Sequence, residues 1–209
     1  MEKIVIMVHG LGRSRFSMFM PGRYLQKRGF SVLYYSYNST RYLLDAHFAK
    51  FADYLNSVAA EHPDAEVHFV SHSMGGILIR GTLTPGLIAK FAHPGRIVML
   101  APPNCGSKMA TNLSKYKILR KILKPLEELS DSPGAVVMTL PVPENMDIGI
   151  ISGRFDGKVR PEEAVLEGAK EHLTVNSYHT FIMNRKDVKK EILHFLNNGE
   201  FSEKSSLFA

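Results

Sequence analysis

Short runs of apolar and β-branched residues recur along the whole chain. They are KIVIMVH (3–9), SVLYYSY (31–37), EVHFVSH (66–72), RIVMLAP (96–102), DIGIISG (147–153) and HLTVNSY (172–178). Runs of this length and composition are typical of strands that are buried on both faces of a sheet. The pattern therefore predicts a central sheet of about six strands.

Between these runs the spacing of apolar residues becomes helical. Phe48, Phe51, Leu55 and Val58 recur at intervals of three and four, which predicts one buried helix face. Strands that alternate with helices need crossover connections, which favours a mostly parallel sheet with helices on both faces. Ligands of such sheets bind beyond the carboxyl ends of the strands, so functional residues are expected directly after the apolar runs. Further helices are expected around 19–28, over 74–83 and over 186–198.

The third run leads directly to Ser73, which precedes a helical segment in HFVSHSMGGILIRG (68–81). The small residues Ser71, Gly75 and Gly76 allow the backbone to turn sharply around Ser73. A strand-to-helix turn of this kind exposes the serine hydroxyl, and the first amides of the helix favour negative charge beside it. Ser73 is therefore our candidate nucleophile, and a helix N-cap without catalysis is the alternative.

A nucleophilic serine needs a base, and the chain has nine histidines. His179 lies just past the last run and before the final helix, at the expected edge of the sheet. The other histidines that we considered for this role lie in loops, before a strand or inside the last helix: His62, His93, His172 and His194. His179 is therefore the candidate base, and a loop histidine without a task is the alternative.

The base in turn needs an acid to orient its ring and to stabilise the imidazolium. Asp156 follows the fifth run in a turn-like context between Gly153 and Gly157. Its rivals Asp131 and Asp147 lie in the less regular stretch that comes before this strand. Asp156 is therefore the candidate acid, although aspartates are also common in turns without any catalytic role.

Acyl transfer also requires hydrogen-bond donors for the tetrahedral oxyanion. The backbone amide of Met74, next to the candidate nucleophile, is one source, and the amide of Leu11 in HGLGRS is another. Gly10 and Gly12 allow the backbone of this loop to approach a ligand closely. The same loop does not match a dinucleotide fingerprint, because Arg15 occupies the position of its third glycine.

The composition is that of an ordinary globular protein, with 44% hydrophobic and 22% charged residues among 209, and predicts a single domain over 1–209. The net charge of +6 comes from one patch, and the rest of the chain carries equal numbers of basic and acidic residues. A localised patch argues against a general nucleic-acid-binding protein. The basic patch comprises Lys108, Lys115, Lys117, Arg120, Lys121 and Lys124.

The region 102–147 is the only sizeable insertion, and it contains this basic patch. We expect a short lid-like segment here, in which a helix carries an apolar face opposite its cations. A basic amphipathic helix covers a site or lies on an anionic membrane, which gives 108–126 as a peripheral membrane contact; an ordinary packing helix is the alternative. A flexible tail is expected over 198–209. The apolar face comprises Met109, Leu113, Tyr116, Leu119, either Ile122 or Leu123, and Leu126.

Neither an export signal nor a membrane span is evident, because the first apolar run is too short. The single cysteine, Cys105, has no partner for an internal disulfide, which fits a reducing compartment, so we expect a cytoplasmic protein. His68 and His72 are about 13 Å apart if both lie on a strand, too far for one metal ion. No metal and no cofactor are expected.

Five segments of the sequence, which include the candidate catalytic residues, together resemble the α/β-hydrolase family, and within it the small lipases and esterases. The resemblance implies Ser73 as nucleophile, His179 as general base and Asp156 as the orienting acid. It also implies Leu11 and Met74 as oxyanion donors. The segments that carry it follow the family's order and are VHGLG (8–12), SHSMGG (71–76), APPNCGS (101–107), GRFDGKV (153–159) and YHTFIM (178–183).

The resemblance implies cleavage of carboxylic esters through an acyl-enzyme, on a small-molecule ester or lipid-like substrate and without nucleic acid. Ser71 departs from the family pattern, since it replaces the first glycine of the nucleophile turn. A thioesterase or acyltransferase with the same three residues is an alternative, as is a partner-binding protein without turnover. A nucleotide-binding protein is disfavoured, because GRFDGKV lacks the spacing and the Ser or Thr of a phosphate loop.

Overall fold

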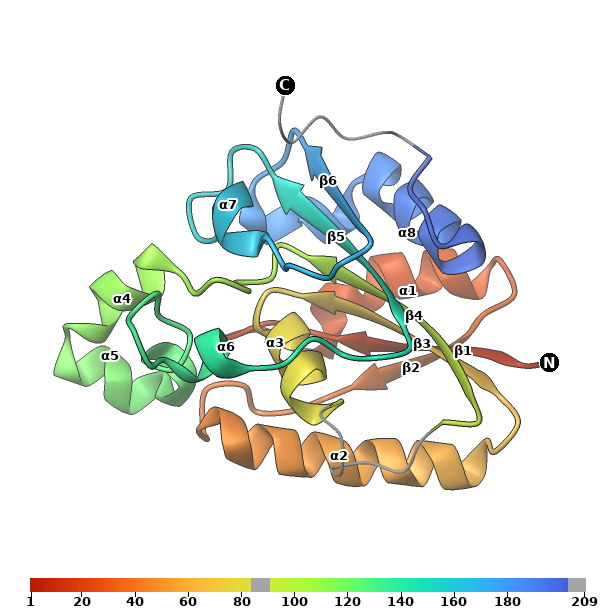
Figure 1. Ribbon diagram of the computed structural model, residues 1–209, viewed down its shortest axis with the longest axis horizontal. Coiled ribbons are helices and arrows are strands. Elements are labelled where there is room, and N and C mark those ends of the chain that lie inside the picture. The colour runs from red at the N-terminus through yellow and green to blue at the C-terminus, as the bar shows by residue number, and fades with distance from the viewer. Residues whose placement is uncertain (84–90, 203–209) are drawn as a thin grey trace.

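A computed structural model describes residues 1–83 and 91–202 and contains one six-stranded sheet (Figure 1). All strand pairings are parallel, in the order β2-β1-β3-β4-β5-β6. The predicted parallel sheet of about six strands is therefore confirmed. Its strands are β1 (Lys3–Val8), β2 (Ser31–Tyr35), β3 (Glu66–His72), β4 (His93–Leu100), β5 (Asp147–Gly153) and β6 (Glu171–Val175).

Helices cover both faces of the sheet, as the alternating pattern predicts. Helices α2 and α3 pack on one face, whereas α1 and α8 pack on the other (Figure 1). The main helices are α1 (Phe19–Gln26), α2 (Leu44–Glu61), α3 (Met74–Thr82) and α8 (Lys186–Asn198). Shorter helices are η1 (Arg15–Met18), α4 (Lys108–Ser114), α5 (Lys117–Ile122), η2 (Lys124–Leu126), α6 (Val136–Thr139), α7 (Pro161–Ala164) and η3 (His179–Asn184).

Strand β1 demonstrates why the apolar runs are continuous. Ile4, Ile6 and Val8 join the core under α2 and α3, while Val5 and Met7 point to the opposite face and join the core under α1 and α8. Successive side chains of a strand point to opposite faces, and here both faces are covered. Every position between Ile4 and Val8 is consequently buried.

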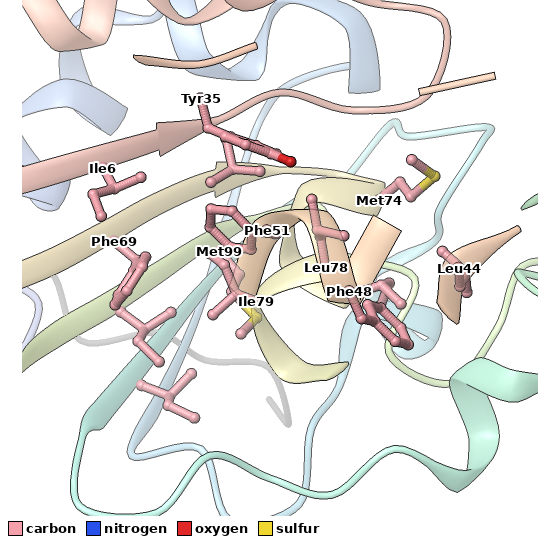
Figure 2. Packing of buried hydrophobic residues seen from close by; sticks show 14 of the residues in the cluster. Ile6, Tyr35, Leu44, Phe48, Phe51, Phe69, Met74, Leu78, Ile79 and Met99 are labelled. Carbon is pink, nitrogen blue, oxygen red and sulfur yellow. The ribbon is translucent and has the colours of Figure 1, made fainter. Parts of the chain in front are cut away.

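The predicted apolar face of 48–58 is buried against the sheet. Phe48, Phe51, Leu55 and Val58 all lie in the core between α2, α3 and the strands. Figure 2 shows Phe48 and Phe51 there. The ring of Phe51 lies 4.5 Å from the ring of Tyr35 on β2, measured between centroids. This part of the sequence pattern is therefore confirmed. The buried face holds α2 against the sheet, where Phe51 contacts β2.

The segment between β4 and β5 does not form the single amphipathic helix that the spacing predicts. It breaks into α4, α5 and η2, because Tyr116 adopts an extended conformation (φ −93°, ψ 112°) between the first two. Leu123 also leaves the helical region (φ −112°, ψ 78°), and Pro125 follows two residues later. Proline lacks the N–H that would continue the α-helix, and its ring clashes with the carbonyl four residues earlier, so α5 ends before it.

The breaks change which side chains face the protein. Leu123 rather than Ile122 turns inward, together with Leu113 and Leu126. Tyr116 and Ile122 point to solvent with exposed fractions of 64% and 59%. The expectation that Tyr116 belongs to the buried face is wrong, because its extended backbone rotates it away from the helical register.

The structure describes residues 198–202 of the expected tail, and several of them contact α8. Gly199 ends α8 in a left-handed conformation (φ 77°), and the ring of Phe201 packs 4.8 Å from that of Phe195. The backbone amide of Ser202 donates to Glu191 at 2.7 Å. Gly199 and Phe201 are buried, and the remainder of the expected tail, 203–209, lies outside the described residues.

None of the helices within 1–83 and 91–202 combines the length with the hydropathy that a membrane crossing requires.

Candidate active site

Ser73 occupies a strained turn between β3 and α3. Its backbone has φ 53° and ψ −128°, a conformation that is uncommon for a residue other than glycine and costs about 1 to 3 kcal/mol. The amide of Ser73 donates to the carbonyl of Leu100 at 2.8 Å, which ties the turn to the end of β4. The side chain is thereby held at the wall of a cavity at the carboxyl edge of the sheet.

Two glycines allow this turn to pack tightly against the loop after β1. A Cβ on Gly75 would lie 2.6 Å from the carbonyl oxygen of Val8, and a Cβ on Gly10 would lie 2.9 Å from the Cβ of Ser73. Both separations are shorter than van der Waals contact, and the obstacles include backbone. Gly10 and Gly75 therefore allow a close approach of two chain segments.

His179 and Asp156 form a buried pair beside Ser73. The Nδ1–H of His179, at the start of η3, donates to Oδ2 of Asp156 at 2.7 Å, and both residues are less than a tenth exposed. This bond leaves Nε2 as the acceptor of the neutral ring. His179 lines the same cavity as Ser73. The structure thus brings the three predicted residues together from the ends of β3, β5 and β6.

The carboxylate of Asp156 is itself fixed by the turn that follows β5. Its Oδ1 accepts backbone N–H bonds from Lys158 at 2.8 Å and Val159 at 2.9 Å, and its own amide donates to the carbonyl of Gly153 at 3.1 Å. Both carboxylate oxygens are therefore occupied, one by the backbone and one by the imidazole. A carboxylate held in this way fixes the orientation and tautomer of the histidine ring.

The rival candidates have other contacts. Asp131 accepts a hydrogen bond from Thr111, and Asp147 pairs with Lys170 at 2.9 Å. Ring Nε2 of His172 accepts the amide of Leu166 at 3.1 Å. Among the described residues, the cavity beside Ser73 is lined by none of the histidines that we set aside, which are His62, His93, His172 and His194.

The expected oxyanion donors lie on the two segments that meet at Ser73. Leu11 lines the cavity, and Met74 is the first residue of α3. The loop that carries Leu11 is fixed by two bonds, from the amide of Gly12 to Ser39 Oγ at 3.0 Å and from the hydroxyl of Tyr37 to the carbonyl of His9 at 2.7 Å. Amides at a helix N-terminus favour an anion, which suits developing negative charge at this position.

The cavity has a volume of about 260 Å³ and is mainly apolar. Its polar side includes Ser73, His179 and His72. Its apolar side is supplied largely by the insertion between β4 and β5, so this segment covers the carboxyl edge of the sheet. The apolar lining residues from the insertion are Pro103, Met109, Ala110, Leu113, Leu123, Leu126 and Leu129.

A buried arginine fastens the insertion to α3. The guanidinium of Arg80 donates to the carbonyl and side chain of Asn104 at 3.2 Å, to the carbonyl of Leu140 at 2.5 Å and to that of Pro141 at 3.3 Å. Burial lowers the pKa of Arg80 to about 10. Sequence reasoning did not find this contact, because the partners lie far away in the chain and include backbone carbonyls, which carry no sequence signal.

His72 is a site residue that the sequence analysis considered only as half of a metal pair. Its Nε2–H donates to the backbone carbonyl of His179 at 3.0 Å, and the two ring centroids are 4.7 Å apart. Complete burial, reinforced by charge repulsion from His179, holds the pKa of His72 well below its ordinary value. A neutral His72 thus supports the position of the candidate base. The sequence signal that could have indicated a role for His72 in the site is its position directly before Ser73.

Within 1–83 and 91–202, no three His, Cys, Asp or Glu side chains are placed to share a metal ion.

No protein-family model and no curated protein matches this sequence. Solved structures match its fold at low identity. The mature lipase BlEst2 of Bacillus licheniformis is 18% identical with a TM-score of 0.71, over 93% of this chain and 89% of the lipase. A metagenomic carboxyl esterase is 16% identical with a TM-score of 0.67, over 86% of this chain and 65% of the esterase. A Silicibacter protein described as a candidate thioesterase is 16% identical with a TM-score of 0.64, over 89% of this chain and 71% of that protein.

Proposed function

We propose that this protein is a serine hydrolase that cleaves carboxylic esters through an acyl-enzyme. Its α/β-hydrolase fold supports the proposal. The observation that carries this proposal is the bond of 2.7 Å between Asp156 and His179, because His179 lines the same cavity as Ser73. A serine beside an oriented imidazole whose Nε2 is left to accept a proton is the arrangement that acyl transfer requires.

In the proposed mechanism, Ser73 Oγ attacks the acyl carbonyl while Nε2 of His179 takes its proton. The carbonyl oxygen becomes an oxyanion and accepts hydrogen bonds from the amides of Leu11 and Met74. His179 then gives the proton to the leaving alcohol, so that the acyl group remains on Ser73. Water attacks this ester with His179 again acting as base, which releases the acid and restores the serine.

The proposed substrate is an ester of modest size with an apolar acyl group. The cavity beside Ser73 holds about 260 Å³ and is lined mostly by aliphatic side chains of the insertion, such as Leu113 and Leu126. Burial of acyl methylene groups there is favourable by about 0.8 kcal/mol each. We therefore propose that the insertion 102–147 acts as a lid over the acyl group.

Labelling with a fluorophosphonate tests the proposed nucleophile. We expect mass spectrometry to locate the label on Ser73, and we expect labelling to be lost in Ser73→Ala and in His179→Ala. Circular dichroism of both variants controls for folding. A folded wild-type protein that is neither labelled nor active on esters would instead favour the partner-binding protein without turnover.

Thioester cleavage is the second candidate function. The similarity of this fold to that of the Silicibacter protein, which is described as a thioesterase candidate, favours it. Ester and thioester cleavage use the same nucleophile and base and differ in the leaving group. A matched pair of oxygen and sulfur esters with one acyl chain distinguishes them. A kcat/KM that is higher for the thioester, after correction for its greater intrinsic reactivity, would replace the esterase assignment.

We also propose that the protein works in the cytoplasm. Its one cysteine, Cys105, is an exposed free thiol, which a reducing compartment preserves. Fractionation of the source cells with an antibody to the protein tests this location, and recovery of the protein outside the cytoplasm would contradict it.

A further inference from the structure

Two cations stand at the candidate active site without an acidic neighbour in the cavity wall. Among the described residues that line the cavity, Arg13 and Lys158 are the only ones that carry a full charge at neutral pH, apart from any charge on histidine. Both side chains are exposed. The cavity is otherwise mainly apolar, so its electrostatic character is positive.

Neither cation is neutralised by the protein. Within 1–83 and 91–202, the side chains of Arg13 and Lys158 make no ion pair, whereas Arg185 pairs with Asp187 and Lys170 pairs with Asp147. The carboxylate nearest to Lys158 in sequence is Asp156, whose two oxygens are occupied by His179 and by backbone amides. The two charges therefore remain available to a ligand.

The sheet topology places these cations on either side of Ser73. Arg13 lies in the loop after β1, and Lys158 lies in the turn after β5, while β3 and its serine lie between those strands. Both charges act electrostatically on His72, the residue directly before Ser73. Burial and charge repulsion from His179 are the main reasons that the pKa of His72 is low, and the positive charges of Arg13 and Lys158 lower it further.

We propose that the preferred substrates are acyl esters whose alcohol half carries a phosphate or a carboxylate, which Arg13 and Lys158 bind at the rim of the cavity. This inference rests on the proposed esterase function and names its substrate class. The aliphatic wall takes the acyl chain, so the alcohol half lies toward the cationic rim. Arginine and lysine both donate charge-assisted hydrogen bonds to such anions.

A matched pair of substrates tests this preference. We would measure kcat/KM for 1-octanoylglycerol and for 1-octanoylglycerol 3-phosphate, both below their micelle concentrations. The same acyl chain serves both, so the ratio of the two values isolates the effect of the phosphate. We expect wild type to favour the phosphate by roughly tenfold or more at low salt, and we expect rising salt to reduce the ratio.

Two substitutions assign the preference to the cations. Arg13→Gln and Lys158→Gln should each lower the ratio by roughly fivefold, since each removes one charge-assisted contact. Arg15→Gln is the matched control, because Arg15 is also exposed but lies outside the cavity wall, with its guanidinium over the ring of Phe16. The control should retain the wild-type ratio.

The outcomes separate this inference from the function on which it rests. Cleavage of the neutral ester without a preference for the phosphate would overturn the inference and leave the esterase assignment intact. A preference that survives both substitutions would also overturn it, because the anion would then bind elsewhere. Failure to cleave either ester, by a protein shown to be folded, would overturn the proposed function and the inference together.

Discussion

At the scale of single residues, the carboxylate of Asp156 has two tasks that an amide cannot perform at once. Its Oδ2 accepts Nδ1–H of His179, while Oδ1 accepts the amides of Lys158 and Val159. In Asp156→Asn the NH₂ group must face either the imidazole or the backbone donors. We expect kcat/KM for esters to fall on the order of 10⁴-fold. Ester hydrolysis measured on the folded variant checks this, and near-normal turnover would contradict the role of Asp156.

The departure at Ser71 has a measurable cost of its own. Its hydroxyl is fully buried, and no described residue provides a hydrogen-bond partner for it. A buried polar group without a partner is unfavourable, so Ser71→Ala should raise the free energy of unfolding by about 1 kcal/mol. Urea titration measures this change.

A second serine provides the matched control for Ser71. The hydroxyl of Ser107 donates to the carbonyl of Lys158 at 2.7 Å and accepts the amide of Ala110 at 3.3 Å. Ser107→Ala should therefore lower the free energy of unfolding, by about 1 kcal/mol. If both substitutions changed stability in the same direction, the difference in hydrogen bonding would not explain the effect of Ser71.

At the scale of elements, helix α5 has an outer face suited to an anionic lipid surface. Ile118 and Ile122 are one helical turn apart and are 71% and 59% exposed. Lys117 and Lys121 are exposed beside them. Exposed isoleucines among cations provide both apolar contact and attraction to negative headgroups. We therefore propose that α5, within the expected contact region 108–126, docks on anionic membranes.

Vesicle sedimentation tests this docking. We expect the protein to bind phosphatidylglycerol vesicles at low salt, to bind phosphatidylcholine vesicles more weakly, and to be released as salt rises. Replacing Ile118 and Ile122 by Ser should weaken the binding, whereas Met138→Ser, at an exposed position on α6, should not. Equal binding to both lipids, or no binding at low salt, would exclude an anionic membrane as the occupant of this face.

At the scale of the whole molecule, four buried histidines and the half-buried His172 make stability depend on pH. These five histidines have a pKa below the ordinary value, and burial is the largest cause for each of them. The pKa of His68 falls to about 4. The unfolded chain binds protons near its ordinary histidine pKa of about 6.5, whereas the folded chain resists them. The free energy of unfolding should therefore fall as pH drops from about 6.5 toward 4. The group comprises His9, His47, His68, His72 and His172.

Urea titrations at a series of pH values between neutrality and pH 5 measure this dependence. The expected slope is toward lower stability in acid, because the unfolded state takes up more protons there. Replacement of His68 by a residue that does not titrate should reduce the slope. A free energy of unfolding that is constant over this range would show that the buried histidines do not resist protonation.

The sequence by itself determined the fold and the meeting of Ser73, Asp156 and His179. Each of these residues directly follows an apolar run or lies a few residues beyond it, and parallel strands bring their carboxyl ends to one edge. Local signals of this kind need no knowledge of distant contacts. The same applies to the buried face of α2, where Phe51 and its neighbours follow the helical period.

Only the tertiary structure decided which of the remaining side chains serve the site. His72 supports His179 across 107 positions of the chain, and Arg80 holds the insertion from 60 positions away. The choice of Leu123 over Ile122 as the inward residue depends on a break in the helix at Tyr116. Residue periodicity describes one regular element at a time, whereas these outcomes depend on contacts between elements, which periodicity does not encode.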